Sequence, residues 1–345
     1  MTTLMRYIRK GAVMLFLLAL TGCSKDEAGN DSDAPVPVRF EAGSPEVFKT
    51  RTEINTLDDL KAPEKNPNGF GVFAYYTGAT AWKSAKASAT PNFMYNQQVT
   101  WDVTNSVWIY TPVKYWPNDN NPADNTGATG SQTHSYVSFF AYAPYSDMSS
   151  HPSSGVTAIR ANSATGAPVL TYIWAEYADL LYASQTDRYK YDSNDANDNG
   201  RVGDVVSFTF RHALVYIEHL KVRLQENTDR TVTLKSLRIG YKTSGTFDLG
   251  NAEWTSTSGS GSRIIRDTDL TVTAYTAESA HDLGGSPLLV IPDITYTIEY
   301  KIGETEYTHN DVSIPGLTIG NKYTIIFTID GDVIKVDTQK FTEQW

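Results

Sequence analysis

Four residues between positions 195 and 200 have the types and spacing of a cation-binding loop. Asp195, Asn197, Asn199 and Gly200 match the first half of a calcium loop, D-x-[DN]-x-[DN]-G, in which alternate side-chain oxygens ligate the ion. Val206 stands where the bidentate glutamate of such a loop belongs, and the flanks lack helical periodicity. A polar surface loop is therefore the favoured interpretation, and a metal site at Asp195, Asn197 and Asn199 is kept as the alternative.

The rest of the sequence offers little catalytic chemistry. It contains no G-x-S-x-G nucleophile elbow, and Ser258–Ser262 (SGSGS) lacks the lysine and the strand–helix context of a phosphate-binding loop. His212 and His219 are seven residues apart on an expected strand, which directs them to opposite faces, so we expect no shared metal. His212 is expected to pack or hydrogen-bond locally. We expect neither an enzyme nor a cofactor, although a distant carboxylate pair has no signature that would reveal it.

Cys23 is the single cysteine of the chain and follows an export signal. A basic start precedes an apolar run over residues 12–20, which is too short to span a bilayer but suits a signal peptide. Leu20–Cys23 (LTGC) resembles the lipobox of bacterial lipoproteins, where the cysteine is lipidated and becomes the new N-terminus. We therefore expect residues 1–22 to be removed and Cys23 to carry acyl chains that attach the protein to the outer membrane.

The residues after Cys23 predict a tether and an address. Ser24–Glu27 (SKDE) resembles the export signal of surface lipoproteins in some Gram-negative anaerobes, and the alternative is a plain acidic linker. Residues 23–35 are polar and are expected to be a flexible tether. The net charge of −10, with no basic cluster beyond the signal peptide, argues against a nucleic-acid partner.

Alternating apolar and polar residues predict an all-β protein. Residues 294–302 alternate Ile or Tyr with Thr, Glu or Lys, and residues 206–210 and 323–329 alternate in the same way. Asp330-Gly331 between two such runs predicts a type I′ hairpin. Residues 55–62 are the one expected helix, with Asp58 and Asp59 in its first turn. Further expected strands are short runs of the same kind: 37–42, 69–76, 106–110, 135–142, 179–183, 213–223, 231–241, 269–275 and 286–291.

Long polar segments divide the chain. Residues 117–134 and 187–204 are rich in Asn, Asp, Gly and Thr and are expected to be surface loops. Because the chain after the tether is long for one core, we expect two antiparallel β-sandwich domains, at residues 36–204 and 205–345.

The tryptophans admit two interpretations. Stacking on sugar rings would suit a cell-surface glycan-binding lipoprotein, whereas burial in strand cores is the commoner fate of such residues. We favour the core for all of them and keep glycan binding as the alternative function. The residues concerned are Trp82, Trp101, Trp108, Trp116 and Trp174.

A series of short motifs resembles one family in its order along the chain. After the lipobox come a first strand, a Thr-Arg-Thr triplet and blocks rich in aromatic residues. In this order the motifs resemble the fimbrillins, the subunits of type V pili in Gram-negative oral and gut anaerobes. The motifs are Val36–Gly43, Thr50–Thr52, Gly69–Phe73, Trp101 with Trp108, Tyr115–Pro117, Phe139–Tyr145, Asp179–Ala183, Phe208–Leu214 and Gly320–Thr324.

The resemblance implies a fold and an assembly mechanism. Fimbrillins have two transthyretin-like β-sandwich domains and reach the outer membrane as lipoprotein precursors. An Arg-specific protease then removes the N-terminal segment with its first strand, and the emptied groove accepts a strand from a neighbouring subunit. The matching cleavage position is Arg51-Thr52, for which a solvated loop is the alternative interpretation. The implied partners are other pilin subunits and the protease.

The C-terminal segment is the expected donor strand. Its apolar residues are Val333, Ile334, Val336, Phe341 and Trp345. A donor strand of this kind adds backbone hydrogen bonds and alternate side chains to a neighbour's sheet. The alternative is a final strand within its own sheet, and the sequence favours neither. Nor does the sequence distinguish a stalk, a tip and an anchor subunit.

Overall fold

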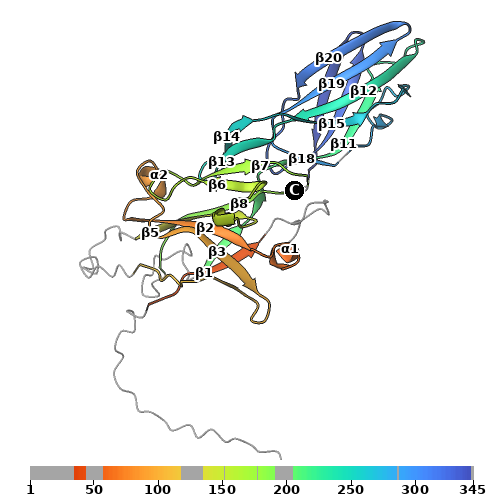
Figure 1. The fold of residues 1–345 in the computed structure, drawn as a ribbon. Coiled ribbons are helices and arrows are strands. Elements are labelled where there is room, and N and C mark those ends of the chain that lie inside the picture. Colours follow the sequence, from red (N-terminus) through yellow and green to blue (C-terminus); the bar gives the residue numbers. More distant parts are fainter. Residues whose placement is uncertain are drawn as a thin grey trace, which may run out of the picture. The chain divides into compact units, whose positions relative to one another are not determined.

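The computed structural model describes residues 35–43, 57–117, 135–150, 152–176, 178–190, 205–285 and 287–342. These residues are built almost entirely of strands, which confirms the all-β class (Figure 1). The helices among them are short: α1 (Leu57–Lys61), α2 (Trp82–Ala85) and the 3-10 turn η3 (Met148–Ser150). None of these helices is long enough to cross a membrane.

Three sheets are formed by strands from the first part of the chain, together with the hairpin β13–β14. Most neighbouring strands are antiparallel, but β1 and β9 are parallel, and so are the strands Val215–Leu224 and Lys322–Asp330 of a sheet described below. The two-stranded sheet is β1 (Arg39–Gly43) with β9 (Val205–Thr209). The six-stranded sheet has the order β10 (Arg211–His212), β8 (Leu181–Arg188), β5 (Tyr136–Ala143), β2 (Phe70–Gly78), β3 (Met94–Asp102) and β4 (Val107–Ile109). The four-stranded sheet has the order β14 (Glu253–Ser258), β13 (Ser244–Asp248), β7 (Val169–Ile173) and β6 (Gly155–Ile159).

Two five-stranded sheets contain the remaining strands (blue and green in Figure 1). One has the order β17 (His281–Asp282), β11 (Val215–Leu224), β21 (Lys322–Asp330) and β22 (Val333–Lys340), with β18 (Leu288–Val290) also on β11. The other has the order β15 (Gly261–Arg266), β12 (Val232–Tyr241), β19 (Ile294–Ile302) and β20 (Thr305–Ser313), with β16 (Leu270–Thr271) also on β12. Inward residues of both sheets, such as Leu234, Ile298 and Phe327, form one apolar core.

Strands β9 and β10 follow residue 204 in the sequence, but each pairs with a strand that precedes it. Val205 opposite Arg39 begins the β1–β9 pair, and β10 pairs with β8. The side chains of Val206 and Phe208 belong to the core that β2 and β5 form. The division of the chain into domains at residues 204 and 205 stays a prediction.

The expected elements are mostly present, with instructive differences. The helix begins at Leu57 and has Asp58 and Asp59 in its first turn, as expected. The β21–β22 hairpin is confirmed, but its turn lies one residue later than predicted. Asp330 pairs with Val333, so Gly331 and Asp332 form the turn, and Gly331 has φ +62. A type I′ turn needs positive φ at both turn positions, but Asp332 is not among the described residues with positive φ, so the turn is of type II′ and the type I′ prediction was wrong.

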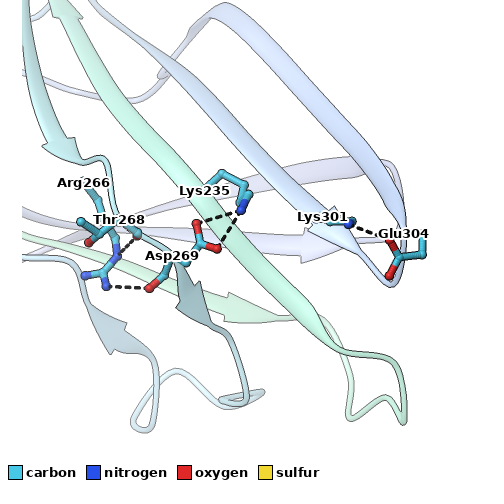
Figure 2. A network of polar contacts seen from close by, with 6 residues as sticks. All are labelled: Lys235, Arg266, Thr268, Asp269, Lys301 and Glu304. Atoms are coloured by element: carbon cyan, nitrogen blue, oxygen red, sulfur yellow. Dashed lines mark hydrogen bonds and ion pairs between the residues drawn. The ribbon is translucent and has the colours of Figure 1, made fainter.

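Charged side chains form two separate groups of polar contacts on the sheet that contains β12 and β19 (Figure 2). Asp269 accepts from the Lys235 ammonium at 2.9 and 2.7 Å, while Arg266 donates to the backbone carbonyls of Thr268 and Asp269. Lys301 and Glu304 pair at 2.9 Å across the β19–β20 turn. This pair raises the pKa of Lys301 and lowers that of Glu304. Exposed pairs of this kind contribute little to stability.

Candidate functional site: the groove filled by the first strand

The first strand is bonded along both of its edges. The Val38 N–H donates to the Lys114 carbonyl, and the Trp116 N–H donates to the Val36 carbonyl, each at 2.9 Å. The Gly43 carbonyl accepts from the Phe210 N–H at 2.8 Å. Gly43 is an odd number of residues after Val38. Because successive residues of a strand present their backbone groups to opposite edges, residues 36–38 bond to the segment 114–116 on one edge, and residues 39–43 pair with β9 on the other. We call the place that residues 36–43 occupy between these two segments the groove.

Alternate side chains of this strand fill the core. Val38, Phe40 and Ala42 are 1%, 4% and 7% exposed, whereas Arg39 and Glu41 face solvent. The Phe40 ring has four aromatic neighbours within 6.3 Å, which are Phe70, Tyr110, Phe139 and Phe208. Complete burial of a phenylalanine contributes about 1.5–3 kcal/mol, and well-oriented aromatic pairs add to this.

The Tyr110 hydroxyl links the first strand to the segment 114–116, which forms one wall of the groove. It donates to the Val38 carbonyl at 2.8 Å and accepts from the Lys114 N–H at 3.2 Å. Burial raises the pKa of Tyr110. Sequence patterns did not identify this residue, because a tyrosine after a short strand has no distinguishing signal.

Side chains of β8 support the opposite wall. The Gln185 amide donates to the Ser207 carbonyl of β9 at 2.8 Å, and the Ser207 hydroxyl donates to the Glu41 carboxylate of β1 at 3.2 Å. Strand β9 pairs with β1 alone among the described strands. Removal of β1 would therefore leave β9 with side-chain contacts and with the packing of Val206 and Phe208.

The C-terminal strand lies at the edge of its own sheet. β22 pairs antiparallel with β21 from Asp330 opposite Val333 to Tyr323 opposite Lys340. Ile334 and Val336 are half-buried on the core, whereas Val333 is 48% exposed. The structure thus shows the tail as a strand of its own sheet, and its use as a donor stays a proposal.

Several residues singled out in the sequence lie outside the described residues. These are Cys23, Arg51, Thr52, Asp195, Asn197, Asn199 and Trp345. Phe341 lies within them and contacts Lys322, whose ammonium is 4.7 Å from the ring centroid. Among the described residues, no cluster of His, Cys, Asp and Glu has the arrangement of a metal site.

Three of the sequence motifs meet around His212, namely Asp179–Ala183, Phe208–Leu214 and Gly320–Thr324. Its Nδ1 lies 2.7 Å from the Asp179 carboxylate, and both side chains are buried. The adjacent Ala213 N–H donates to the Leu180 carbonyl at 2.7 Å, and the Gly320 N–H donates to the Leu214 carbonyl at 2.8 Å. His212 is therefore hydrogen-bonded in the interior. His219 is separate from it and pairs with Asp282 at 3.1 Å.

Most of the tryptophans are in the core, as favoured. Trp82, Trp108 and Trp116 are 6%, 8% and 3% exposed. Trp101 packs against the core that contains Trp108 and Trp116. Trp174 donates through its indole N–H to the Leu289 carbonyl at 2.6 Å. An exposed aromatic platform for sugars is therefore not formed by these residues.

Comparisons with known proteins show the family to which the chain belongs. The profile of the fimbrillin-like family matches residues 50–345. The fimbrium subunit Fim1C of Phocaeicola vulgatus is 26% identical over 388 aligned positions, covering 96% of this chain and 95% of that one. The crystal structure of a fimbrial protein from Bacteroides vulgatus has a TM-score of 0.57 at 23% identity, covering 90% of this chain and 99% of that one. With most of its length matched by that profile, the chain belongs to the fimbrillin-like family.

Proposed function

We propose that this protein is a structural subunit of a type V pilus that serves adhesion at the cell surface. It is made as a lipoprotein attached to the outer membrane through Cys23 and is activated by cleavage between Arg51 and Thr52. The cleaved subunits polymerise by donor-strand exchange. Support comes from the family, from the relative that is named a fimbrium subunit, and from the groove around β1.

The position of β1 is the observation that carries the proposal. The strand is bonded on both edges and buried on one face, yet it lies upstream of Arg51. Cleavage after Arg51 would break its only covalent connection to the rest of the fold. Once β1 dissociates, two strand edges and an apolar slot lined by Phe70, Phe139 and Phe208 are exposed. Such a surface binds an added strand.

The tail has suitable chemistry for that slot. In its own sheet β22 has one neighbouring strand, and its inward residues Ile334 and Val336 are half-buried. In the groove a strand has a neighbour on each edge, and the inward positions of Val38, Phe40 and Ala42 are almost completely buried. Full burial of an aliphatic side chain contributes about 1.5–3 kcal/mol, so the inward side chains of the tail would gain burial in the groove.

Repetition of this contact yields a filament. A tail that leaves one subunit and enters the groove of the next makes a head-to-tail contact, and a contact of this type need not close into a ring. The lipid at Cys23 is lost with the excised segment, so cleavage releases the subunit from the membrane into the growing polymer.

Cleavage and assembly are tested together with the Arg51→Ala variant. The wild-type precursor and the variant are treated with an Arg-specific protease, and N-termini are determined by mass spectrometry while polymers are followed by size and by electron microscopy. We expect the wild type to begin at Thr52 and to form high-mass polymers, and the variant to stay uncleaved and monomeric. Lys49→Ala is the matched control and should behave as wild type. A cleaved wild type that stays monomeric would contradict the assembly mechanism.

A further inference from the structure

The carboxyl-terminal end of β22 is bound to Lys322. The last pair of the β21–β22 ladder is Tyr323 opposite Lys340, and the Phe341 N–H continues it by donating to the Lys322 carbonyl at 3.0 Å. The Lys322 side chain then contacts the same residue, with its ammonium 4.7 Å from the centroid of the Phe341 ring. Backbone and side chain of Lys322 therefore both hold Phe341.

The Lys322 ammonium is itself held in place. The residue is 7% exposed, and its Nζ lies 2.6 Å from Oε2 of Glu218 and 5.8 Å from the centroid of the Tyr216 ring. A buried ammonium is costly unless it is paired, so the Glu218 carboxylate fixes where the charge lies. A cation fixed over an aromatic face attracts the ring, more strongly when water is excluded. The Phe341 ring thus contacts an ammonium group whose position is fixed by Glu218.

The other end of β22 is constrained by the hairpin turn. Its turn is continuous with β21, and the Tyr300 hydroxyl donates to the Gly331 carbonyl at 2.8 Å. Lys335 and Asp330 also form an ion pair at 2.7 Å next to this turn. Local opening begins where a strand is least constrained, which leaves the C-terminal end as the place where β22 detaches. Phe341 stands at that end.

We propose that Lys322 and Phe341 form a latch that retains the C-terminal strand in its own subunit. Loss of the contact between them is the first step in the detachment of β22. The purpose of the latch, to keep the donor strand sequestered until a groove is available, rests on the proposed function. Retention of β22 by these two residues does not rest on the proposed function, because it concerns the uncleaved monomer.

Hydrogen exchange of the uncleaved full-length chain tests the latch. In Phe341→Ala the backbone of β22 is retained while the ring is lost, and we expect its amides to exchange roughly three- to thirtyfold faster than in the wild type. The matched control is Thr342→Ala at the adjacent exposed position, which should leave the exchange rates unchanged. Unchanged protection of the β12 and β19 amides verifies that the variant is folded.

The charge is tested separately. Lys322→Met keeps an unbranched apolar chain without the ammonium, and it should raise the exchange of β22 as Phe341→Ala does. Lys322→Arg keeps a cation at this place and should restore protection. Wild-type exchange of β22 in both Phe341→Ala and Lys322→Met would overturn the proposal. The measurement precedes cleavage, so a failure of the cleaved protein to polymerise would contradict the proposed function and leave the latch intact.

Discussion

The rings of Phe40 and Phe208 stack with their centroids 5.8 Å apart and an interplanar angle of 14°. Phe40 lies on β1, upstream of the proposed cleavage position, and Phe208 lies on the strand that would line the empty groove. The contact joins β1 to β9 in one aromatic cluster. The precursor core is thus completed by a segment that, in our proposal, the mature subunit obtains from its neighbour.

Truncation of this ring should destabilise the precursor. Phe40→Ala removes a nearly buried side chain that contacts four aromatic rings, and such changes cost about 3–5 kcal/mol. The free energy of unfolding is measured by urea denaturation of the uncleaved chain. Glu41→Gln on the exposed face of the same strand is the control and should have little effect. A Phe40→Ala variant as stable as the wild type would mean that β1 is not part of the folded core.

The buried pair of His212 and Asp179 should be essential to stability. Asp179→Ala leaves the imidazole without this acceptor in the interior, and loss of one partner of a buried pair costs about 3 kcal/mol. Asp179→Asn retains an oxygen that can accept from His212 and should be less destabilising. Thermal and urea unfolding of the two variants distinguishes them. Equal stability of Asp179→Ala and Asp179→Asn would show that this hydrogen bond contributes nothing.

Alkaline pH should weaken the contact between Tyr300 and the hairpin turn. Burial, together with the nearby Asp332 carboxylate, raises the pKa of Tyr300 to about 12. A group with a raised pKa contributes its full stability below the pKa of the unfolded chain, about 10, and loses it as the pH rises through 12. Tyr300→Phe lacks the hydrogen bond to Gly331, so the wild type should be the more stable at pH 8.

The difference between these two proteins is the measured quantity, because other buried tyrosines affect both equally. Urea midpoints at pH 8, 10 and 11.5 should show the advantage of the wild type shrinking as the pH rises. A constant advantage would contradict the raised pKa of Tyr300 as its source.

Strands buried on one face were predictable from their residues. Residues 294–302 alternate strictly, and β19 occupies Ile294–Ile302 with alternate side chains buried. A strand with no buried face was harder to predict. β20 (Thr305–Ser313) is mostly exposed and polar, so no alternation identifies it. β3 (Met94–Asp102) escaped prediction because its centre is a run of polar residues, Asn96, Gln97 and Gln98.

The groove itself was not visible in the sequence. The residues 36–43 show a strand pattern, but their pairing with β9 and with residues 114–116 joins segments far apart in the chain. The same holds for Asp179 and His212, which approach only because β10 pairs with β8. A single sequence shows the local alternation that predicts a strand, but it does not show which other strand pairs with it. The resemblance to a family supplied the expectation that the first strand fills a groove, but not which segments line that groove.

An inter-subunit disulfide tests most directly whether the tail of one subunit fills the groove of another. Cys23 is the only cysteine and would be removed by cleavage, so engineered cysteines have no competitor. Ser207→Cys on β9 takes the place opposite Glu41 of β1, and Lys335→Cys, Asp337→Cys and Gln339→Cys occupy outward positions of β22. Neighbouring strands lie about 4.7–4.9 Å apart, a separation that a disulfide spans.

Each pair is placed in a Cys23→Ser precursor, cleaved with an Arg-specific protease and oxidised. For at least one outward tail position we expect a ladder of disulfide-linked multimers, with position 207 joined to the tail by mass spectrometry. Val336→Cys on the inward face is the matched control and should not form the ladder. If every outward position leaves the cleaved protein as unlinked monomers, donor-strand exchange by this tail is wrong.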